Sequence, residues 1–191
     1  MRKIIVFNMV SLDGYFAGPK GDISWHNTDE EFGKFADEQT AMFGTQIYGR
    51  ITYQAMASYW PTADAIKNDP VVAKLMNTTP KIVFSKTLKN VKETENWKNI
   101  KLFKNINPEE IKKLKIQKGR DIVVFGSGTI VQQFTNLGLI DEYWIMINPV
   151  VLGKGKLLFK NIKDKLNLKL LKTRTFKNGN ILLYYKQANK K

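Results

Sequence analysis

A turn that could bind an anion lies within residues 123–134, VVFGSGTIVQQF. The residues before Gly126-Ser127-Gly128 are typical of a strand, and those after it follow the pattern of a helix. A helix that begins on such a turn leaves backbone N–H groups without carbonyl partners and directs the positive end of its dipole at one point. The turn therefore predicts an anion site, with an ordinary tight glycine turn as the alternative.

Two further stretches offer similar chemistry. In YGRITY, Gly49 again separates a strand from a helix start, Arg50 adds a cation and Thr52 adds a hydroxyl group. In FSKTL, Ser85 and Lys86 follow a strand and could hold a further phosphate, such as the 2′-phosphate of NADP. Because ligands of open α/β sheets bind at the carboxyl ends of strands, these stretches could together hold a nucleotide. A surface arginine and an ordinary polar loop are the alternatives.

Several classes of site are excluded by the residue types present. Val131 stands where the dinucleotide fingerprint has its third glycine, and the Lys-Ser/Thr pair of a Walker A loop is missing, so neither motif is indicated. The chain has no cysteine and His26 is its only histidine, which excludes disulfides, thiolate metal sites and histidine-rich metal sites. We therefore expect no metal.

The elements that must position these residues alternate along the chain. Strand patterns are followed by helix patterns as far as residue 137, and three strands without helices close the chain. This order predicts an α/β fold, with a mostly parallel central sheet, helices on both faces and antiparallel C-terminal strands. A single domain is expected over residues 1–191. The expected strands are 3–10, 45–48, 81–85, 100–104, 121–125, 141–152, 168–176 and 180–187, and the expected helices are 28–43, 51–60, 69–77, 128–137 and one that begins at Asn107-Pro108.

Two local signals sharpen this assignment. Thr28 with Glu31 three residues later has the form of a capping box at the start of the helix 28–43. Lys177-Asn178-Gly179 joins the last two strands and signals a hairpin.

The charge is strongly positive, with a formal net charge of +14 at pH 7. Only four of the 31 basic residues are arginines, and the lysines are spread over the chain. A solvated lysine-rich surface is therefore favoured over a specific nucleic-acid face, which remains the alternative. The apolar run near Met1 is too short for a signal peptide or a membrane span, so a cytoplasmic protein without a membrane partner is expected.

Several motifs together resemble those of a known family. SLDGYFAG, YGRITYQ, IVFSKTL and the stretch 123–159 occur in the order found in the dihydrofolate-reductase-like fold, over nearly the whole chain. They are most similar to the reductase domain of bifunctional riboflavin-biosynthesis deaminase-reductases. The resemblance implies a three-layer fold and a stand-alone, NADPH-dependent reductase of a small heterocycle, like 5-amino-6-(5-phosphoribosylamino)uracil reductase. A dihydrofolate reductase-like enzyme, or a non-catalytic protein that binds a nucleotide or nucleic acid, is the alternative.

The resemblance also implies where NADPH binds. The adenosine end is expected near Ser85 and Lys86. The residues expected to hold the cofactor's phosphates are Gly49, Arg50, Thr52, Gly126, Ser127, Gly128, Thr129 and Ile130.

The substrate side is expected around the glycine-rich loop from Ser11 to Trp25, which resembles the segment that closes over nicotinamide and substrate. The family's carboxylate on the first helix corresponds to the region of Glu30, whose neighbours Asp29 and Glu31 fit equally well, and all three also suit a helix N-terminus. The expected catalytic residues are Asp13 and Glu30, and the expected substrate-binding residues are Phe16, Trp25, His26 and Lys154. The alternatives are a packing role for His26 and a solvated connection between strands for Lys154.

A homodimer is the last expectation. Trp144-Ile145-Met146-Ile147 forms a long apolar strand that we place near the edge of the sheet, and such edges are usually covered.

Overall fold

Apolar, β-branched runs form the strands of one eight-stranded sheet in the computed structural model, which describes residues 1–188. The order of strands is β5-β4-β3-β6-β1-β7-β10-β9. The strands are β1 (Ile4–Ser11), β3 (Phe43–Gly49), β4 (Lys81–Phe84), β5 (Ile100–Phe103), β6 (Asp121–Gly126), β7 (Glu142–Asn148), β9 (Leu168–Thr175) and β10 (Ile181–Gln187).

The first six strands in this order are parallel, and the C-terminal pair adds antiparallel neighbours. Ile4 lies opposite Ile122 of β6, and Ile5 lies opposite Glu142 of β7. Strand β10 runs antiparallel to both β7 and β9. Gly179, at a φ of 90°, forms the turn of the β9–β10 hairpin, where few residues other than glycine are stable. The predicted sheet and hairpin are confirmed.

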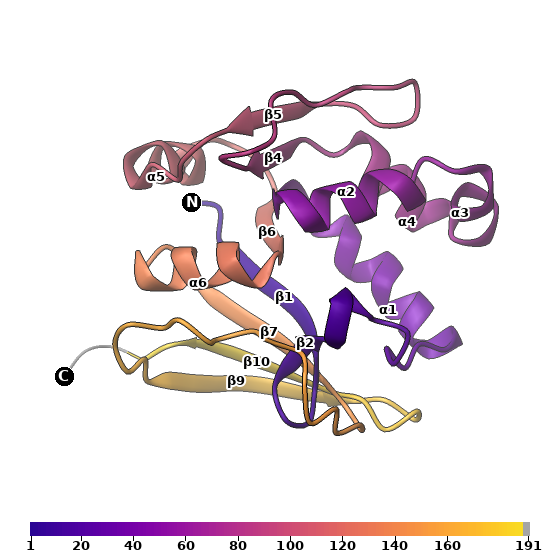
Figure 1. Cartoon of the computed structure of the whole chain (residues 1–191), viewed down its shortest axis with the longest axis vertical. Helices are drawn as coiled ribbons and strands as arrows, with labels where there is room; N and C mark the ends of the chain where they lie inside the picture. Colours follow the sequence, from indigo (N-terminus) through magenta and orange to yellow (C-terminus); the bar gives the residue numbers. More distant parts are fainter. Residues whose placement is uncertain (189–191) are drawn as a thin grey trace.

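Helices cover both faces of the sheet (Figure 1). Helices α5 and α6 lie on one face, and α1, α2, α3 and α4 lie on the other. The helices are α1 (Glu30–Ala41), α2 (Arg50–Tyr59), α3 (Ala63–Asn68), α4 (Pro70–Thr78), α5 (Pro108–Ile116) and α6 (Gly128–Asn136), with a short 3₁₀ helix at Pro19–Gly21. A separate two-stranded ribbon joins β2 (Tyr15–Ala17) to β8 (Lys156–Leu157).

Alternate residues of the central strand supply the two halves of the core. Ile4 and Val6 pack beneath α5 and α6, whereas Ile5 and Phe7 pack beneath α1. Each such side chain stabilises the fold by about 1.5–3 kcal/mol when it is fully buried. The continuous apolar run of β1 is therefore explained by its burial on both faces, as expected of a parallel strand.

The start and end of the first helix differ from the prediction. Asp29, not Thr28, caps α1, because its Oδ1 accepts a hydrogen bond from the Phe32 N–H at 2.8 Å. Phe43 does not belong to the helix and opens β3, where it is buried. Phe43 matched the helical spacing of apolar residues by chance. A single apolar residue at a helix–strand junction fits both the 3.6-residue period of a helix and the two-residue period of a strand.

Strand β7 is not at the edge of the sheet. It pairs with β1 on one side and with β10 on the other, and Trp144 and Met146 are buried. It is also shorter than expected, ending at Asn148. The apolar character of this strand thus reflects a central position, and the reason given for a homodimer was wrong.

Candidate functional site

Two of the three predicted phosphate turns lie in direct contact. A Cβ atom placed on Gly49 would lie 2.6 Å from Ser127 Oγ and 2.8 Å from Ile130 Cγ1. Gly126 has a φ of 123°, a conformation that side-chain-bearing residues rarely adopt. The ends of β3 and β6 therefore approach closely enough to require glycine, and they bring the starts of α2 and α6 to one place.

Within residues 1–188, no side chain caps the N–H groups at these two helix starts. Neither Gly49, which precedes α2, nor Ser127, which precedes α6, provides a side-chain cap within the described chain. By contrast, Asp29 caps α1 and Asn107 caps α5 through their side chains. Two adjacent uncapped helix starts form a positive backbone pocket, so these residues fit the pyrophosphate of a dinucleotide.

Three side chains border this backbone pocket. Thr52 Oγ1 is 3.2 Å from a Cβ atom placed on Gly126, so its hydroxyl group lies against the turn. The ring of Phe16 lies over Gly128, 2.6 Å from a Cβ atom placed there. Arg50 is exposed, and its Nη1 donates a hydrogen bond to Gln54 Oε1 at 3.2 Å. Of the remaining predicted residues of this turn, Thr129 is exposed and Ile130 is buried in the core.

The third predicted stretch borders a small hollow of about 180 Å³ next to α6. Lys86 and Lys104 both line it, together with Ile130 and Gln133. Ser85 shapes the loop, because its Oγ accepts hydrogen bonds from the backbone N–H groups of Thr87 and Leu88. Two lysines beside the first half of α6 suit a phosphate at the adenosine end of a nucleotide.

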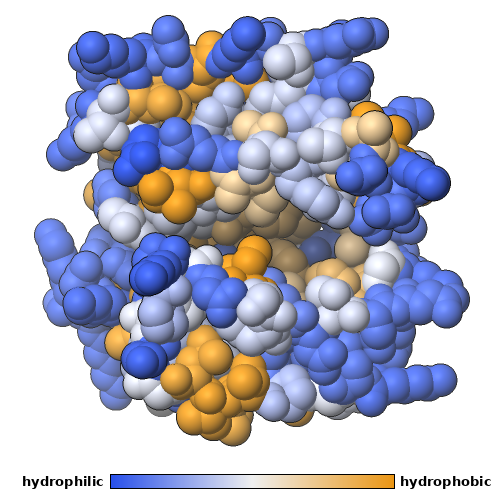
Figure 2. Space-filling view, turned by 45° about the vertical axis from the view of Figure 1, so that its right-hand side comes forward, coloured by the Kyte–Doolittle hydropathy of each residue, from blue (hydrophilic) through white to orange (hydrophobic). Residues whose placement is uncertain are grey.

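A larger cavity of about 650 Å³ lies on the opposite face of the sheet, between β1, β6 and the helices α1, α2 and α4. The molecule is hollowed across its middle, with apolar residues inside the hollow and hydrophilic residues around it (Figure 2). Phe7, Phe32 and Phe125 are among the aromatic residues that line the cavity. Its volume is typical of a small-molecule site.

Three polar atoms in this cavity have no hydrogen-bond partner within the described chain: Asn8 Oδ1, His26 Nε2 and Gln39 Nε2. Asn8 and Gln39 are buried, with 9% and 4% of their surface exposed. Buried polar groups are normally paired, so these atoms are exceptions, as are Asn77 Oδ1, Trp97 Nε1 and Asn180 Oδ1 outside the cavity lining. Burial lowers the pKa of His26, against a smaller opposing effect of Asp22, so its imidazole is neutral at pH 7.

The cavity and the backbone pocket meet at Asn8 and Phe125. Phe125 lines the cavity and immediately precedes Gly126. Asn8 Nδ2 donates a hydrogen bond to the Phe125 carbonyl oxygen at 3.1 Å, and it lies 3.8 Å from a Cβ atom placed on Gly126. A molecule in the cavity would therefore lie next to a dinucleotide bound at the turn, as a reaction between the two requires.

The two carboxylates predicted to be catalytic lie outside the cavity lining. Asp13 accepts hydrogen bonds from Ser11 Oγ at 2.6 Å and from the N–H groups of Leu152 and Gly153 at 3.1 and 2.7 Å. The Ser11 hydrogen bond, with those from the backbone, lowers the pKa of Asp13. Glu30 is exposed and pairs with Lys34 at 2.6 Å. Asp13 thus fixes a loop, and Glu30 extends the charged surface of α1.

The residues predicted to bind substrate are separated. His26 lines the cavity, and its ring packs edge-on against Trp25 with the centroids 4.5 Å apart. The indole N–H of Trp25 donates a hydrogen bond to the Asp22 carbonyl oxygen. Lys154 is exposed in the loop after β7, and Phe16 lies at the backbone pocket. Within residues 1–188, His26 alone of these four belongs to the cavity lining.

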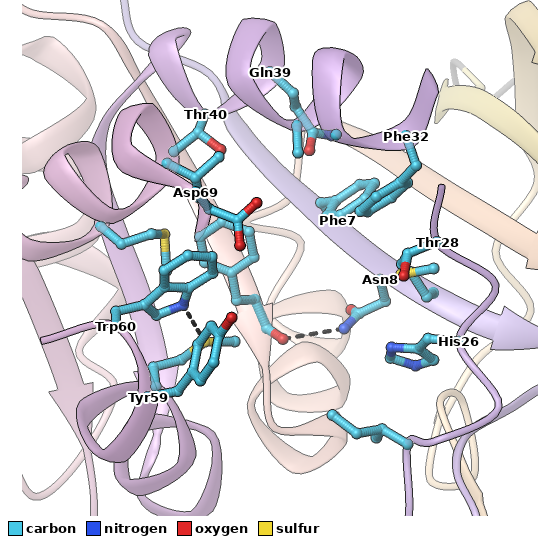
Figure 3. Close-up of a pocket in the computed structure, with 18 of the residues that line it drawn as sticks. Phe7, Asn8, His26, Thr28, Phe32, Gln39, Thr40, Tyr59, Trp60 and Asp69 are labelled. Carbon is cyan, nitrogen blue, oxygen red and sulfur yellow. Dashed lines mark hydrogen bonds between the residues drawn. The ribbon is translucent and has the colours of Figure 1, made fainter. Parts of the chain in front are cut away.

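Other cavity residues were missed by the sequence reasoning. Asn8, Gln39, Tyr59, Trp60 and Asp69 all line the cavity (Figure 3). Asn8, a polar residue in the apolar run of β1, was the one local signal that could have indicated a site. The other four come from helices and from the α3–α4 junction, and tertiary packing alone brings them together.

Among residues 1–188, no group of three or more His, Cys, Asp or Glu side chains is arranged to hold a metal ion. No helix in the same range is long and apolar enough to cross a membrane.

Several known proteins are similar to this chain in sequence or in fold. The chain matches the RibD C-terminal domain family over residues 2–182. It is 36% identical over 185 residues to the uncharacterized protein YyaP of Bacillus subtilis strain 168, covering 96% of this chain and 94% of YyaP. A candidate riboflavin biosynthesis protein from Shewanella sp. PV-4 has a similar structure, with a TM-score of 0.73, 25% identity and coverage of 98% and 99% of the two chains. Dihydrofolate reductase from Enterococcus faecalis, complexed with NADP(H), shares the fold at a TM-score of 0.65 and 13% identity, with coverage of 98% and 97%.

Proposed function

The chain belongs to the RibD C-terminal domain family, and from this premise we propose that it is an NADPH-dependent reductase of a small heterocyclic substrate. One observation carries the proposal: two uncapped helix starts lie in contact beside a cavity of small-molecule size. The fold shared with a dihydrofolate reductase that was solved with NADP(H) supports the choice of cofactor. The reaction class is that of the riboflavin-pathway reductases.

The protein's part in such a reaction is to bind and orient. NADPH, when bound, supplies a hydride. We assign the pyrophosphate to the N–H groups at the starts of α2 and α6, with Thr52 and Arg50 beside them. Lys86 and Lys104 supply positive charge for the 2′-phosphate, which favours NADPH over NADH.

The substrate is assigned to the cavity of about 650 Å³. Its aromatic walls exclude water from the reacting atoms, and Asn8 lies between the two ligands. His26 is neutral because its pKa is lowered, and its imidazole can hydrogen-bond to the substrate. The cytoplasmic location expected from the sequence stays a prediction.

Titration with NADPH and NADH, followed by quenching of tryptophan fluorescence, tests the cofactor assignment. We expect NADPH to bind more tightly than NADH. Arg50→Ala should weaken NADPH binding about tenfold, which corresponds to about 1.4 kcal/mol, because one charge-assisted contact is lost. Gly49→Ala should abolish binding, because its Cβ atom would collide with Ser127 and Ile130.

The control is Lys67→Ala, which removes an exposed cation on α3. It should leave NADPH affinity unchanged, and circular dichroism should show that every variant is folded. Wild-type protein that binds neither nucleotide would refute the reductase. Retention on DNA that disappears at moderate salt would then favour the nucleic-acid alternative.

A further inference from the structure

The charge of the cavity contrasts with the charge of the protein. The chain carries a net charge of +14, yet within the described chain the cavity is lined by two carboxylates, Asp29 and Asp69, and by no lysine or arginine. Asp29 is engaged in capping α1, whereas the side chain of Asp69 makes no capping bond to α4. A phosphate bound here would meet negative charge and find no cation, and an unpaired buried charge is strongly unfavourable.

The mouth of the cavity does not supply the missing positive charge. The adjoining hollow at the start of α1 is lined by Asp29, Glu30, Glu31, Lys34 and Lys177. The side chain of Lys34 is paired with Glu30 at 2.6 Å. The backbone N–H of Lys177 donates a hydrogen bond to Glu31 Oε2. The acidic residues therefore outnumber the basic ones in this hollow, which makes it a poor phosphate site.

Aromatic side chains surround the carboxylate of Asp69, which interacts with the hydroxyl group of Tyr59. Asp69 lies beside Trp60 and Tyr59, while Asn8 and His26 lie on the opposite side of the cavity (Figure 3). The Trp60 indole N–H is directed to Met56 Sδ at 3.1 Å, and the ring packs edge-to-face with Tyr59 with the centroids 5.0 Å apart. A carboxylate among aromatic faces attracts a cationic or amino-bearing ring through charge and cation–π interaction.

The unpartnered polar atoms complete this chemical description. Asn8 Oδ1 is an acceptor without a donor, in a residue that is 9% exposed. Gln39 Nε2 is a donor without an acceptor, in a residue that is 4% exposed. Both atoms are closed off from solvent, so a ligand in the cavity reaches them only when the lining side chains shift; an N–H group would then suit Asn8, and a ring nitrogen or carbonyl oxygen would suit Gln39.

We propose that the substrate cavity takes a flat aromatic amine that carries no phosphate. This inference rests on the proposed reductase function, since it names the substrate class of the same site, and it departs from the phosphoribosyl substrate that the family resemblance implies. The positive surface of the protein then serves the cofactor, and the substrate is bound by Asp69, the aromatic walls and the unpartnered amides.

Two probes test the proposal without cofactor, on the full chain. One is 4-aminoquinoline, a flat cationic amine, and the other is uridine 5′-monophosphate, a phosphoribosyl pyrimidine. We expect 4-aminoquinoline to bind wild-type protein and quench its tryptophan fluorescence, and uridine 5′-monophosphate, which can occupy the phosphate pocket of the cofactor, not to displace the amine. Asp69→Asn should weaken amine binding at least tenfold, whereas Asp164→Asn, which changes an exposed carboxylate away from the cavity, should not.

A charge reversal provides the second measurement. Asp69→Lys should abolish binding of 4-aminoquinoline, with an unchanged melting temperature as evidence of folding. Displacement of the amine from wild type by uridine 5′-monophosphate, unchanged amine affinity in Asp69→Asn, or no binding of the amine to wild type would overturn the proposal. Because no nucleotide cofactor is added, these outcomes are separate from failure to bind NADPH, which concerns the reductase itself.

Discussion

Asp13 has a defined structural task. Its carboxylate accepts one hydrogen bond from Ser11 and two from the backbone at Leu152 and Gly153, so it joins the loop after β1 to the loop after β7. The family resemblance of the loop from Ser11 to Trp25 implied a catalytic role for Asp13, which stays a prediction. Its partners in the second loop lie about 140 positions away in the sequence, so no local pattern could have indicated this role.

Replacing Asp13 with alanine should loosen both loops. Amide hydrogen exchange at Leu152 and Gly153 should accelerate, because their acceptor is lost. Since the pKa of Asp13 is lowered from its ordinary 3.8, its contribution is complete above that pH and is lost as the pH falls through the lowered value. Asp64→Ala, which removes an exposed carboxylate of α3, is the control, and equal exchange in both variants would contradict this role.

At the scale of elements, a buried lysine fixes the junction of α4 and β4. Lys81 Nζ donates hydrogen bonds to the carbonyl oxygens of Asn77, Thr79 and Lys98 at 2.9, 2.8 and 3.1 Å. It also lies 4.4 Å from the ring centroid of Trp97. Burial lowers the pKa of Lys81 to about 8. The end of α4 and the segment before β5 are thereby joined through one ammonium group.

The pH dependence of stability should reveal this lysine. Between the folded pKa of about 8 and the ordinary value of 10.5, the unfolded chain holds a proton that the folded one has released. The contribution of Lys81 to the free energy of unfolding therefore rises with pH, by at most about 1.4 kcal/mol per unit.

Denaturant unfolding of wild type and Lys81→Met at several pH values from 8 to 9.5 measures this effect. The difference should grow in favour of wild type as the pH rises. Lys74→Met, which replaces an exposed lysine on α4, should show no such trend. A difference independent of pH would disprove the assignment.

The regular elements were more predictable than the site. Long strands such as β1 and β6 and the helix starts at Arg50 and Gly128 follow from buried apolar runs and glycine turns. The short elements α3, β2 and β8 were missed, since so few residues show no periodicity. The glycine turns could be predicted because a positive φ or a close approach of two backbones requires glycine, and glycine is visible in the sequence. Asp69 was recognised only as a helix start, because its place in the cavity depends on the packing of α4.

At the scale of the whole molecule, the true apolar edge of the sheet is β9. Among the described strands, β9 and β5 occupy the two ends of the sheet. Leu168, Leu170 and Leu171 of β9 are 38%, 47% and 42% exposed. A strand edge with exposed leucines is prone to association with another copy, so we propose β9, rather than β7, as the contact strand of the expected homodimer.

Sedimentation over a range of concentrations tests this assignment. Wild type should sediment as a dimer, and Leu170→Lys should give a monomer because a charge replaces an apolar contact. Ile116→Lys, which changes an exposed apolar residue at the end of α5, should leave the dimer intact. A wild-type monomer would remove the expectation of a dimer.

The central position of β1 also bears on how the protein is made. The first strand of the chain has as its neighbours β6 and β7, with Ile4 facing Ile122 and Ile5 facing Glu142. At a synthesis rate of about 5–20 residues per second, β1 leaves the ribosome roughly 6–24 s before Ile122. During that interval an apolar strand has both of its hydrogen-bonding edges unpaired. The native sheet therefore closes only after β7 has emerged.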